Sequence, residues 1–248
     1  MLEMVALGRR FGERWAVQKL DASIQAGEVV GFLGPNGAGK TTTIKMIAGL
    51  LLPSDGTISV AGHDVVKEPD QAKRNLAYLP DRPYIPERLS ARELLLYVAG
   101  LYGLGDEIVA TRGMAELERF GLAGREDELL SSYSHGMRQR VLLAAAMMRM
   151  PDVLLVDEPM VGLDPQGARL VRRVLREAAD RGAVVLMSTH TLSIVEEMCD
   201  RVLVMREGEL VADGAVADLM RAATSAQGAA PENLETLFLA LTGSVDAR

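Results

Sequence analysis

The segment Val29-Val-Gly-Phe-Leu33, followed by Gly34-Pro-Asn-Gly-Ala-Gly39-Lys40-Thr41, decides the fold of this 248-residue chain. Its first part is a short apolar run, which predicts a buried β-strand. Its second part fits the pattern G-x-x-x-x-G-K-[ST], in which glycines let backbone N–H groups approach a phosphate without a side-chain clash. A helix that starts at Lys40 adds its N-terminal dipole. The segment therefore predicts a strand, a phosphate-binding loop and a helix.

The two polar residues at the end of this loop have distinct expected roles. Lys40 should reach the β- and γ-phosphates of a nucleoside triphosphate, and the Thr41 hydroxyl should bind Mg²⁺. The other residues expected to contact the nucleotide here are Gly34, Pro35, Asn36, Gly37, Ala38, Gly39 and Thr42. A glycine-rich turn without a ligand is the alternative. The agreement of strand, spacing, lysine and hydroxyl argues against that alternative.

Other short apolar runs alternate with helical patterns along the chain. They are Leu76 to Leu79, Val153 to Val156 and Val184 to Met187, and this alternation predicts an α/β fold with a largely parallel sheet. The N-terminal runs, Met4 to Leu7 and Ala16 to Ile24, have only a polar turn between them, so we expect a small antiparallel β layer. Between Pro86 and Met150 apolar residues recur at helical spacing, which predicts an all-helical insertion.

We expect one domain over residues 1–248. Its α/β core covers residues 1–85 and 150–220, with a hairpin over Arg201 to Asp213, and its helical subdomain covers residues 86–149. Residues 221–248 should form a linker, rich in Ala, Ser, Thr, Gln and Gly as far as Ala230, and a last helix over Pro231 to Leu241.

A pair of acids follows the apolar strand that starts at Val153. A strand this apolar is buried on both faces, so Asp157 and Glu158 should emerge at the carboxyl edge of the sheet, where α/β proteins bind ligands. We expect Asp157 to hold Mg²⁺ through water and Glu158 to polarise the attacking water. A solvated acidic turn is the alternative. His190 follows the next strand and should reach the same edge, although a lone histidine is often structural.

Five motifs in order carry a family resemblance. They are the phosphate loop, Tyr133-Ser-His-Gly-Met-Arg-Gln-Arg140, Asp157-Glu158, Gly162-Leu-Asp-Pro165 and Ser188-Thr-His190. Together they resemble the ATP-binding-cassette (ABC) ATPases, most closely the stand-alone ATP-binding subunits of bacterial transporters, of exporter type. The likeness runs from about Met1 to Gly214. It implies an α/β P-loop NTPase core with an N-terminal antiparallel β layer and a helical insertion, and the cofactors ATP and Mg²⁺.

The resemblance also assigns residues that local patterns leave open. It implies that Ser134 and Gly136 bind the γ-phosphate of the nucleotide held by a second subunit, and that Asp164 crosses the dimer interface. It implies that His190 senses the γ-phosphate and orients Glu158. Without the family, Ser134 and Asp164 read as N-caps of the helices that follow them. His135 stands where the family often has glycine.

Two further positions, Asp81 and Phe11, each have an alternative interpretation. Asp81 stands where the family usually has glutamine, and it either ligates Mg²⁺ or its water, or is only a turn residue before Pro83. Phe11 matches the residue that stacks on adenine, with Trp15 as its rival and an exposed turn aromatic as the plain alternative.

Composition limits the function classes. The net charge of −7 argues against nucleic acid as a main partner, and a single cysteine excludes an internal disulfide. No apolar run is long enough to span a bilayer. We therefore expect a cytoplasmic protein. The resemblance further implies that it is peripheral on the inner membrane face through a separate transmembrane permease, with a second ATPase subunit as partner in a homodimer. The rivals are a soluble ABC ATPase not coupled to transport and a non-hydrolysing ATP-binding scaffold.

Overall fold

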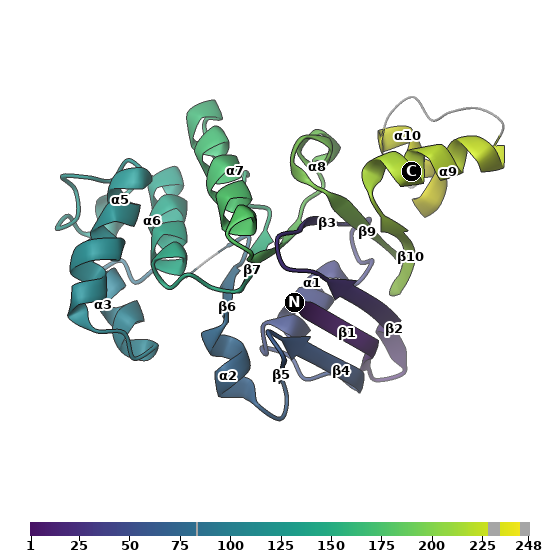
Figure 1. Cartoon of the computed structure of the whole chain (residues 1–248), viewed down its shortest axis with the longest axis horizontal. Coiled ribbons are helices and arrows are strands. Elements are labelled where there is room, and N and C mark those ends of the chain that lie inside the picture. The colour runs from purple at the N-terminus through teal and green to yellow at the C-terminus, as the bar shows by residue number, and fades with distance from the viewer. Residues whose placement is uncertain (83, 228–233, 244–248) are drawn as a thin grey trace.

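The computed structural model describes residues 1–82, 84–227 and 234–243, and its centre is a six-stranded sheet (Figure 1). The strands lie in the order β10-β9-β3-β8-β7-β6. Their bounds are β3 Val29–Leu33, β6 Leu76–Leu79, β7 Val153–Asp157, β8 Val184–Ser188, β9 Arg201–Arg206 and β10 Glu209–Gly214. Strands β6 to β9 and β3 run parallel, and β10 pairs antiparallel with β9. The predicted parallel sheet is confirmed.

A second sheet is antiparallel and lies beside the first. Its strands are β1 (Leu2–Phe11), β2 (Arg14–Ile24), β4 (Asp55–Val60) and β5 (His63–Asp64), in the order β2-β1-β4-β5. This is the expected N-terminal layer, enlarged by two strands that the sequence analysis did not predict. The β1–β2 pairing contains several register shifts, and Ala6 and Lys19 adopt positive φ angles of 47° and 43° at these irregularities.

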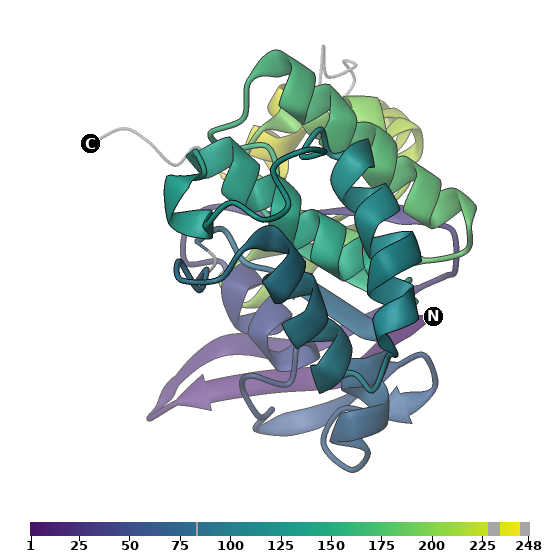
Figure 2. The same ribbon diagram turned by 90° about the vertical axis from the view of Figure 1, so that its left-hand side faces the viewer.

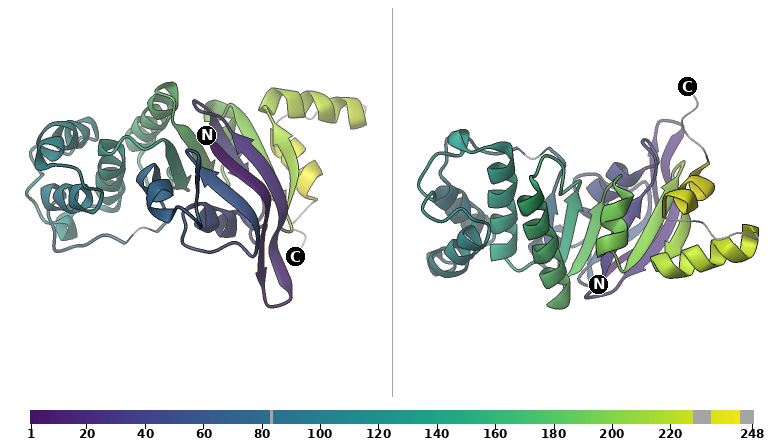
Figure 3. Two further views of the ribbon diagram at one scale, coloured as in Figure 1. Left: turned by 60° about the horizontal axis from the view of Figure 1, so that its bottom comes forward. Right: turned by 90° about the horizontal axis from the view of Figure 1, so that it is seen from above.

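Alternating side chains of the central strands build two cores. Val153 and Leu155 face helix α1 (Lys40–Ile47) and the antiparallel sheet, whereas Leu154 and Val156 face helix α7 (Pro165–Asp180). Such burial on both faces is the reason these strands read as continuous apolar runs. Seen from above, α7 and α8 (Leu192–Met198) lie over the sheet on the side away from β1 and β4 (Figure 3).

Helices gather at the end of the molecule that is farthest from the antiparallel sheet (Figures 1 and 2). They are α3 (Ala91–Leu101), α4 (Asp106–Ile108), a π-helical turn (Val109–Gly113), α5 (Met114–Arg119), a 3-10 turn (Leu130–Ser132) and α6 (His135–Met148). Helix α3 begins with a capping box, in which Ser90 and Glu93 satisfy each other's backbone N–H groups. The short α2 (Pro69–Arg74) precedes β6.

Arg149, at the end of α6, joins this helical region to the sheet. Its guanidinium donates to the carbonyl oxygens of Lys73, Arg74 and Leu76 at 3.0–3.2 Å and lies 3.3 Å from the centroid of the Tyr102 ring. Burial lowers the pKa of Arg149. A guanidinium is suited to this position because it can bond carbonyls at a helix C-terminus and stack on an aromatic ring at once.

The C-terminal region differs from the expectation in one respect. Helix α9 runs over Val216–Gln227, so residues 221–227, which we expected in a linker, are helical. The first turns of α9 are packed through Val216, Leu219 and Met220 against a cluster that includes Val202 and Val204 of β9, and the helix continues from there into residues 221–227. The rest of the expected linker lies outside the described residues, as do the first residues of the expected last helix, and α10 is described over Leu234–Thr242. Over the described residues, no helix is long and apolar enough to cross a membrane.

Candidate nucleotide-binding site

The phosphate loop connects β3 to α1 and depends on glycine at two close contacts. A Cβ added to Gly34 would lie 2.4 Å from the Met205 carbonyl oxygen, and one added to Gly39 would lie 2.4 Å from the Ala16 oxygen. Both residues also have positive φ angles. Gly37 has a φ of 81° and open space where a Cβ would stand. The loop is therefore pressed against β2 and β9 on one side and presents bare backbone on the other.

Lys40 and the start of α1 supply positive charge to this open side. The Lys40 ammonium donates to the carbonyl oxygens of Gly34 and Pro35. Burial lowers its pKa, an effect that the carboxylates of Glu158 and Asp157 oppose. No side chain caps α1, so N–H groups of its first turn remain available to an anion. Thr41 is exposed and Thr42 half-buried beside them.

A cavity of about 460 Å³ lies over this loop and includes an aromatic side chain. It is lined by Phe11, Arg14, Ala16 and residues 36–42. Phe11 is 51% exposed and thus accessible to a ligand. Arg14 was not among the expected site residues, and its only signal was its place in the turn after Phe11. The hollow has the loop, a cation and an aromatic ring on its walls.

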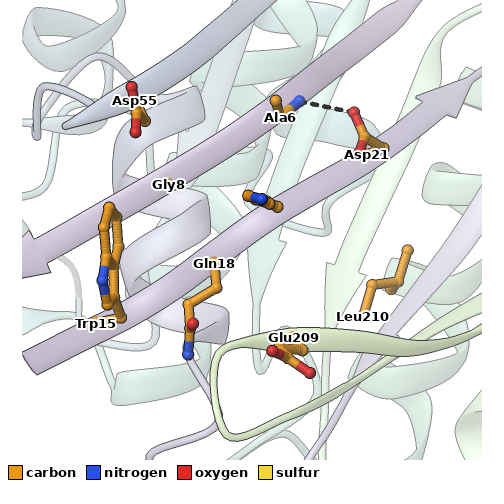
Figure 4. A pocket seen from close by; sticks show the side chains of 9 residues that line it. Ala6, Gly8, Trp15, Gln18, Asp21, Asp55, Glu209 and Leu210 are labelled. Atoms are coloured by element: carbon orange, nitrogen blue, oxygen red, sulfur yellow. Dashed lines mark hydrogen bonds between the residues drawn. The ribbon is translucent and has the colours of Figure 1, made fainter.

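Trp15, the rival of Phe11, lies elsewhere. It lines a separate hollow on the β1–β2 surface with Gln18, Asp55 and Glu209 (Figure 4). Its indole packs against Gly8, where an added Cβ would stand 3.0 Å from the ring. The structure therefore places Phe11, and not Trp15, beside the phosphate loop.

Glu158 and His190 meet at the carboxyl edge of the sheet. The Nδ1 atom of His190 lies 2.7 Å from Oε1 of Glu158, which also accepts the His190 backbone N–H at 3.0 Å. The Thr189 hydroxyl donates to Oε2 of Glu158 at 3.1 Å. The His190 side chain is 73% exposed, so its other edge faces solvent and is free for a ligand. Thr189 was quoted only as part of a motif, and the structure makes it a direct partner of Glu158.

Asp157 is the last residue of β7, directly before Glu158, and is half-buried. Burial raises its pKa, a hydrogen bond from Ser188 opposes this, and the charges of Glu158 and Asp81 add to the rise. Burial likewise raises the pKa of Tyr78 to about 12, again with Asp157 and Asp81 contributing. Asp81 therefore lies within electrostatic reach of Asp157, although its nearest ion pair is with Arg82 at 3.8 Å.

These carboxylates fit Mg²⁺ as oxygen donors, yet they do not enclose a cation by themselves. In the described parts of the chain, no three His, Cys, Asp or Glu side chains are grouped closely enough to hold a metal ion. Mg²⁺ is typically held by one or two protein oxygens together with substrate phosphates. Asp157, with Thr41 across the edge, matches that pattern.

The other expected nucleotide-binding residues lie at helix starts outside the phosphate loop. Ser134 caps α6 by accepting the Met137 N–H at 3.3 Å, and Asp164 caps α7 by accepting the Gly167 N–H at 2.6 Å. Gly136 lies close to the Leu163 side chain. Within one subunit, the start of α6 thus lies against the loop before α7, at Leu163. Ser134 and Asp164 are N-caps of their helices, as the local sequence predicts.

The strand, phosphate loop and helix, with a carboxylate–histidine pair at the same sheet edge, define a P-loop nucleoside-triphosphatase. The chain belongs to the ABC transporter family, because the sequence model of that family matches residues 17–161. Members of this family of ATPases hydrolyse ATP.

Relatives and solved structures agree with this assignment. The chain is 38% identical over 88% of its length to the daunorubicin/doxorubicin resistance ATP-binding protein DrrA of Streptomyces peucetius, and it spans 66% of that protein. It is 39% identical over 84% of its length to a Nod factor export ATP-binding protein I of Burkholderia lata, of which it spans 68%. A solved ATP-binding subunit of an ABC transporter matches with a TM-score of 0.90 and 32% identity, covering 97% of this chain and 99% of that one.

Proposed function

We propose that this chain is the ATP-hydrolysing subunit of a membrane exporter. The observation that carries the proposal is the Glu158–His190 pair, 2.7 Å apart, at the sheet edge that also holds the phosphate loop. A pure ATP-binding scaffold has no need for a carboxylate held by an imidazole and a hydroxyl. That arrangement is what a general base requires, because its orientation toward water is set before the substrate binds.

The division of labour at the site follows from position and charge. Lys40 and the N–H groups of the loop and α1 bind the phosphates, and Phe11 stacks on the adenine. Thr41 and Asp157 would hold Mg²⁺, which would neutralise phosphate charge, and Asp81 either joins them as a ligand or is only a turn residue. Glu158 takes the proton of the attacking water. His190 keeps the Glu158 carboxylate in place on one side and contacts the γ-phosphate with its exposed edge.

Two copies of the chain complete each site. Ser134, Gly136 and Asp164 are exposed or half-buried at the starts of α6 and α7, where N–H groups and a hydroxyl can bind an anion. Since their own subunit's phosphate loop is not among their contacts, we assign them to the nucleotide of a second subunit. ATP bound between the subunits then holds a head-to-tail homodimer together, and hydrolysis of the ATP lets the subunits separate.

The membrane partner is a separate permease, which holds the subunit at the inner face of the membrane. Its docking place is a groove of about 1230 Å³ between the segment after Asp81 and helices α3 and α6. Tyr84 and Tyr97 are 89% and 58% exposed on this groove. Three arginines, Arg82, Arg88 and Arg138, outnumber Glu87 on its walls. We therefore expect a short permease helix with an apolar face and at least one acidic side chain.

The direction of transport rests on the relatives. Of the two relatives described above, one is an ATP-binding protein named for drug resistance and the other an ATP-binding protein named for export. Export is accordingly the direction that we propose.

Replacing Glu158 by Gln tests the proposal. Glu158→Gln removes the base and keeps the shape, so ATP and Mg²⁺ should bind while phosphate release falls by at least ~100-fold. The same variant should form an ATP-dependent dimer, measured by size-exclusion chromatography with light scattering. Asp152→Asn, on an exposed acid at the opposite end of β7, is the matched control and should keep the parental rate. Hydrolysis by Glu158→Gln at more than half the parental rate would refute the role of Glu158.

A further inference from the structure

His135 lies where three parts of the molecule meet. It is the first residue of α6, directly between Ser134 and Gly136. Its side chain also lines the groove that we assign to the permease, together with Tyr97 and Arg138. Its imidazole lies over Gly162, where an added Cβ would stand 2.8 Å from Cδ2 and 3.1 Å from Nε2. One exposed side chain thus contacts the groove on one side and the loop after Glu158 on the other.

The loop between Glu158 and Asp164 is short and internally bonded. The Val161 N–H donates to the Glu158 carbonyl at 3.2 Å, and the Leu163 N–H donates to that of Met160 at 3.3 Å. Glu158 itself has a φ of 50°, a conformation that persists only where the surroundings enforce it. A displacement at Gly162 therefore reaches the Glu158 backbone through two turns.

We propose that His135 is a positioning residue that transmits occupancy of the groove to Glu158 through its contact with Gly162. This proposal rests on the assignment of hydrolysis to this site. A helix seated in the groove presses on the imidazole, the imidazole moves Gly162, and Glu158 changes its distance from the attacking water. Glycine at position 162 permits the close contact, and an imidazole at position 135 makes it. A glycine at position 135 would leave the groove and the loop without this contact.

A double-mutant cycle tests the contact itself. Gly162→Ala puts a methyl group 2.8 Å from Cδ2 of His135, so the exposed imidazole must turn away or the loop must shift. The fall in kcat should follow the share of this shift that the loop takes, with about 100-fold, the scale of a displacement of about 1 Å, as its upper limit. In a His135→Ala background the same substitution should cost several times less, because the collision is gone. Strain from the positive φ of Gly162 is present in both backgrounds and cancels. The KM for ATP should change less than kcat in these proteins, since the phosphate loop, Lys40 and the Ser134 hydroxyl are all retained.

A merely structural role of His135 predicts a different pattern. The thermal unfolding midpoint would fall with kcat, and the two substitutions would lower kcat independently. Equal costs of Gly162→Ala in both backgrounds would overturn the proposal.

A label in the groove tests the transmission. The chain's single cysteine, Cys199, is partly buried, and burial raises the pKa of its thiol to about 12, so maleimides should react only with an introduced thiol. Fluorescein maleimide on Tyr97→Cys should change kcat by about twofold or more when His135 is present, and not in His135→Ala. The same label on Leu101→Cys, also on α3 and 63% exposed but outside the groove lining, is the matched control.

The outcomes separate this inference from the proposed function. If Glu158→Gln abolishes hydrolysis but the groove label acts equally with and without His135, or not at all, the inference fails and the function stands. If Glu158→Gln hydrolyses ATP normally, the proposed function fails first.

Discussion

At the scale of single residues, the site depends on side chains whose environment sets their charge and direction. Glu158 is held by three donors in a left-handed backbone conformation that costs about 1–3 kcal/mol. Asp157 is half-buried, close to two other acids, and its pKa is raised. Lys40 is the cation that balances them. The carboxylates at this edge of the sheet therefore carry more negative charge than Lys40 neutralises, until a cation binds there.

Asp81 offers a direct test of this charge balance. Asp81→Asn removes one negative charge, so the pKa of Asp157 should fall. Asp157 then stays ionised to lower pH, and the acidic limb of the pH–rate profile should move to lower pH. If Asp81 also ligates Mg²⁺ or its water, half-maximal activity should require more Mg²⁺. Steady-state phosphate release, measured across pH and Mg²⁺ concentration, checks both effects.

Asp81→Gln serves as a companion, because it restores the amide usual in the family without the turn chemistry that Asn and Asp share. A protein with Asp81→Asn that keeps the parental Mg²⁺ requirement and pH profile would show that Asp81 is only a turn residue. The effect on pH should be modest, since the Asp81 side chain is 45% exposed and screened by solvent.

Phe11 is the second residue whose role can be separated from its rival. Phe11→Ala should weaken ATP binding by about tenfold, the scale of one lost aromatic stacking contact, and leave kcat nearly unchanged. Trp15→Phe, in the separate hollow of Figure 4, is the control and should keep the affinity. Competition with a fluorescent ATP analogue measures both. Equal affinities for Phe11→Ala and the parent would remove Phe11 from the site.

At the scale of elements, function depends on where strands end and helices begin. The ends of β3, β7 and β8 place the phosphate loop, Glu158 and His190 side by side, because Asp157 pairs with Ser188 and Phe32 pairs with the same residue. Ser134 and Asp164 cap the starts of α6 and α7. The N–H groups of these first turns that have no partner within the helix are free to bind an anion.

Removal of the Arg149 guanidinium should weaken the attachment of α6 to the start of β6. Arg149→Leu leaves three carbonyls without their donor, and hydrogen bonds from a charged group contribute about 1.5–3 kcal/mol. We expect the free energy of unfolding to fall by roughly that amount in urea titrations. Arg181→Leu, on an exposed arginine at the end of α7, is the control and should change it by no more than about 0.5 kcal/mol. Equal midpoints for the two variants would contradict the structural role of Arg149.

At the scale of the whole molecule, the proposed homodimer requires the two lobes of one subunit to hold halves of different sites. The phosphate loop packs against β2 of one sheet and β9 of the other, whereas Ser134 and Gly136 belong to the start of α6, in the helical region (Figure 1). A second copy can bring the halves together, as the proposed homodimer requires. Neither half alone surrounds a nucleotide.

Mixing two inactive variants tests this arrangement. Ser134→Arg disrupts the half of the site at the start of α6, and Lys40→Ala disrupts the half at the phosphate loop, so each protein alone should fail to dimerise with ATP. Together they form one intact site per pair, and nucleotide-dependent dimerisation should return. Light scattering of the single and mixed proteins, in a Glu158→Gln background, measures it. Full activity of Ser134→Arg as a monomer would contradict the proposal.

The local chemistry of the chain determined much of this arrangement in advance. Apolar runs bounded by glycine and proline identified β3 and β6 to the residue, and they fell one residue short at β7 and β8 because Asp157 and Ser188 still pair in the ladder. The phosphate-loop pattern located its strand and helix, since its glycines are required by local geometry. The order of strands and helices then brought Glu158 and His190 to one edge.

Contacts between distant segments decided the rest. Strand β4 pairs with β1 across some fifty residues, and α9 continues from packed first turns into a segment of linker-like composition. Register shifts in the β1–β2 hairpin set Phe11 toward the phosphate loop and Trp15 into another hollow. The position of His135 over Gly162 depends on how α6 meets the loop before α7. Side-chain patterns report the neighbours along a strand or helix, whereas these contacts depend on the packing of whole elements, which only the folded chain establishes.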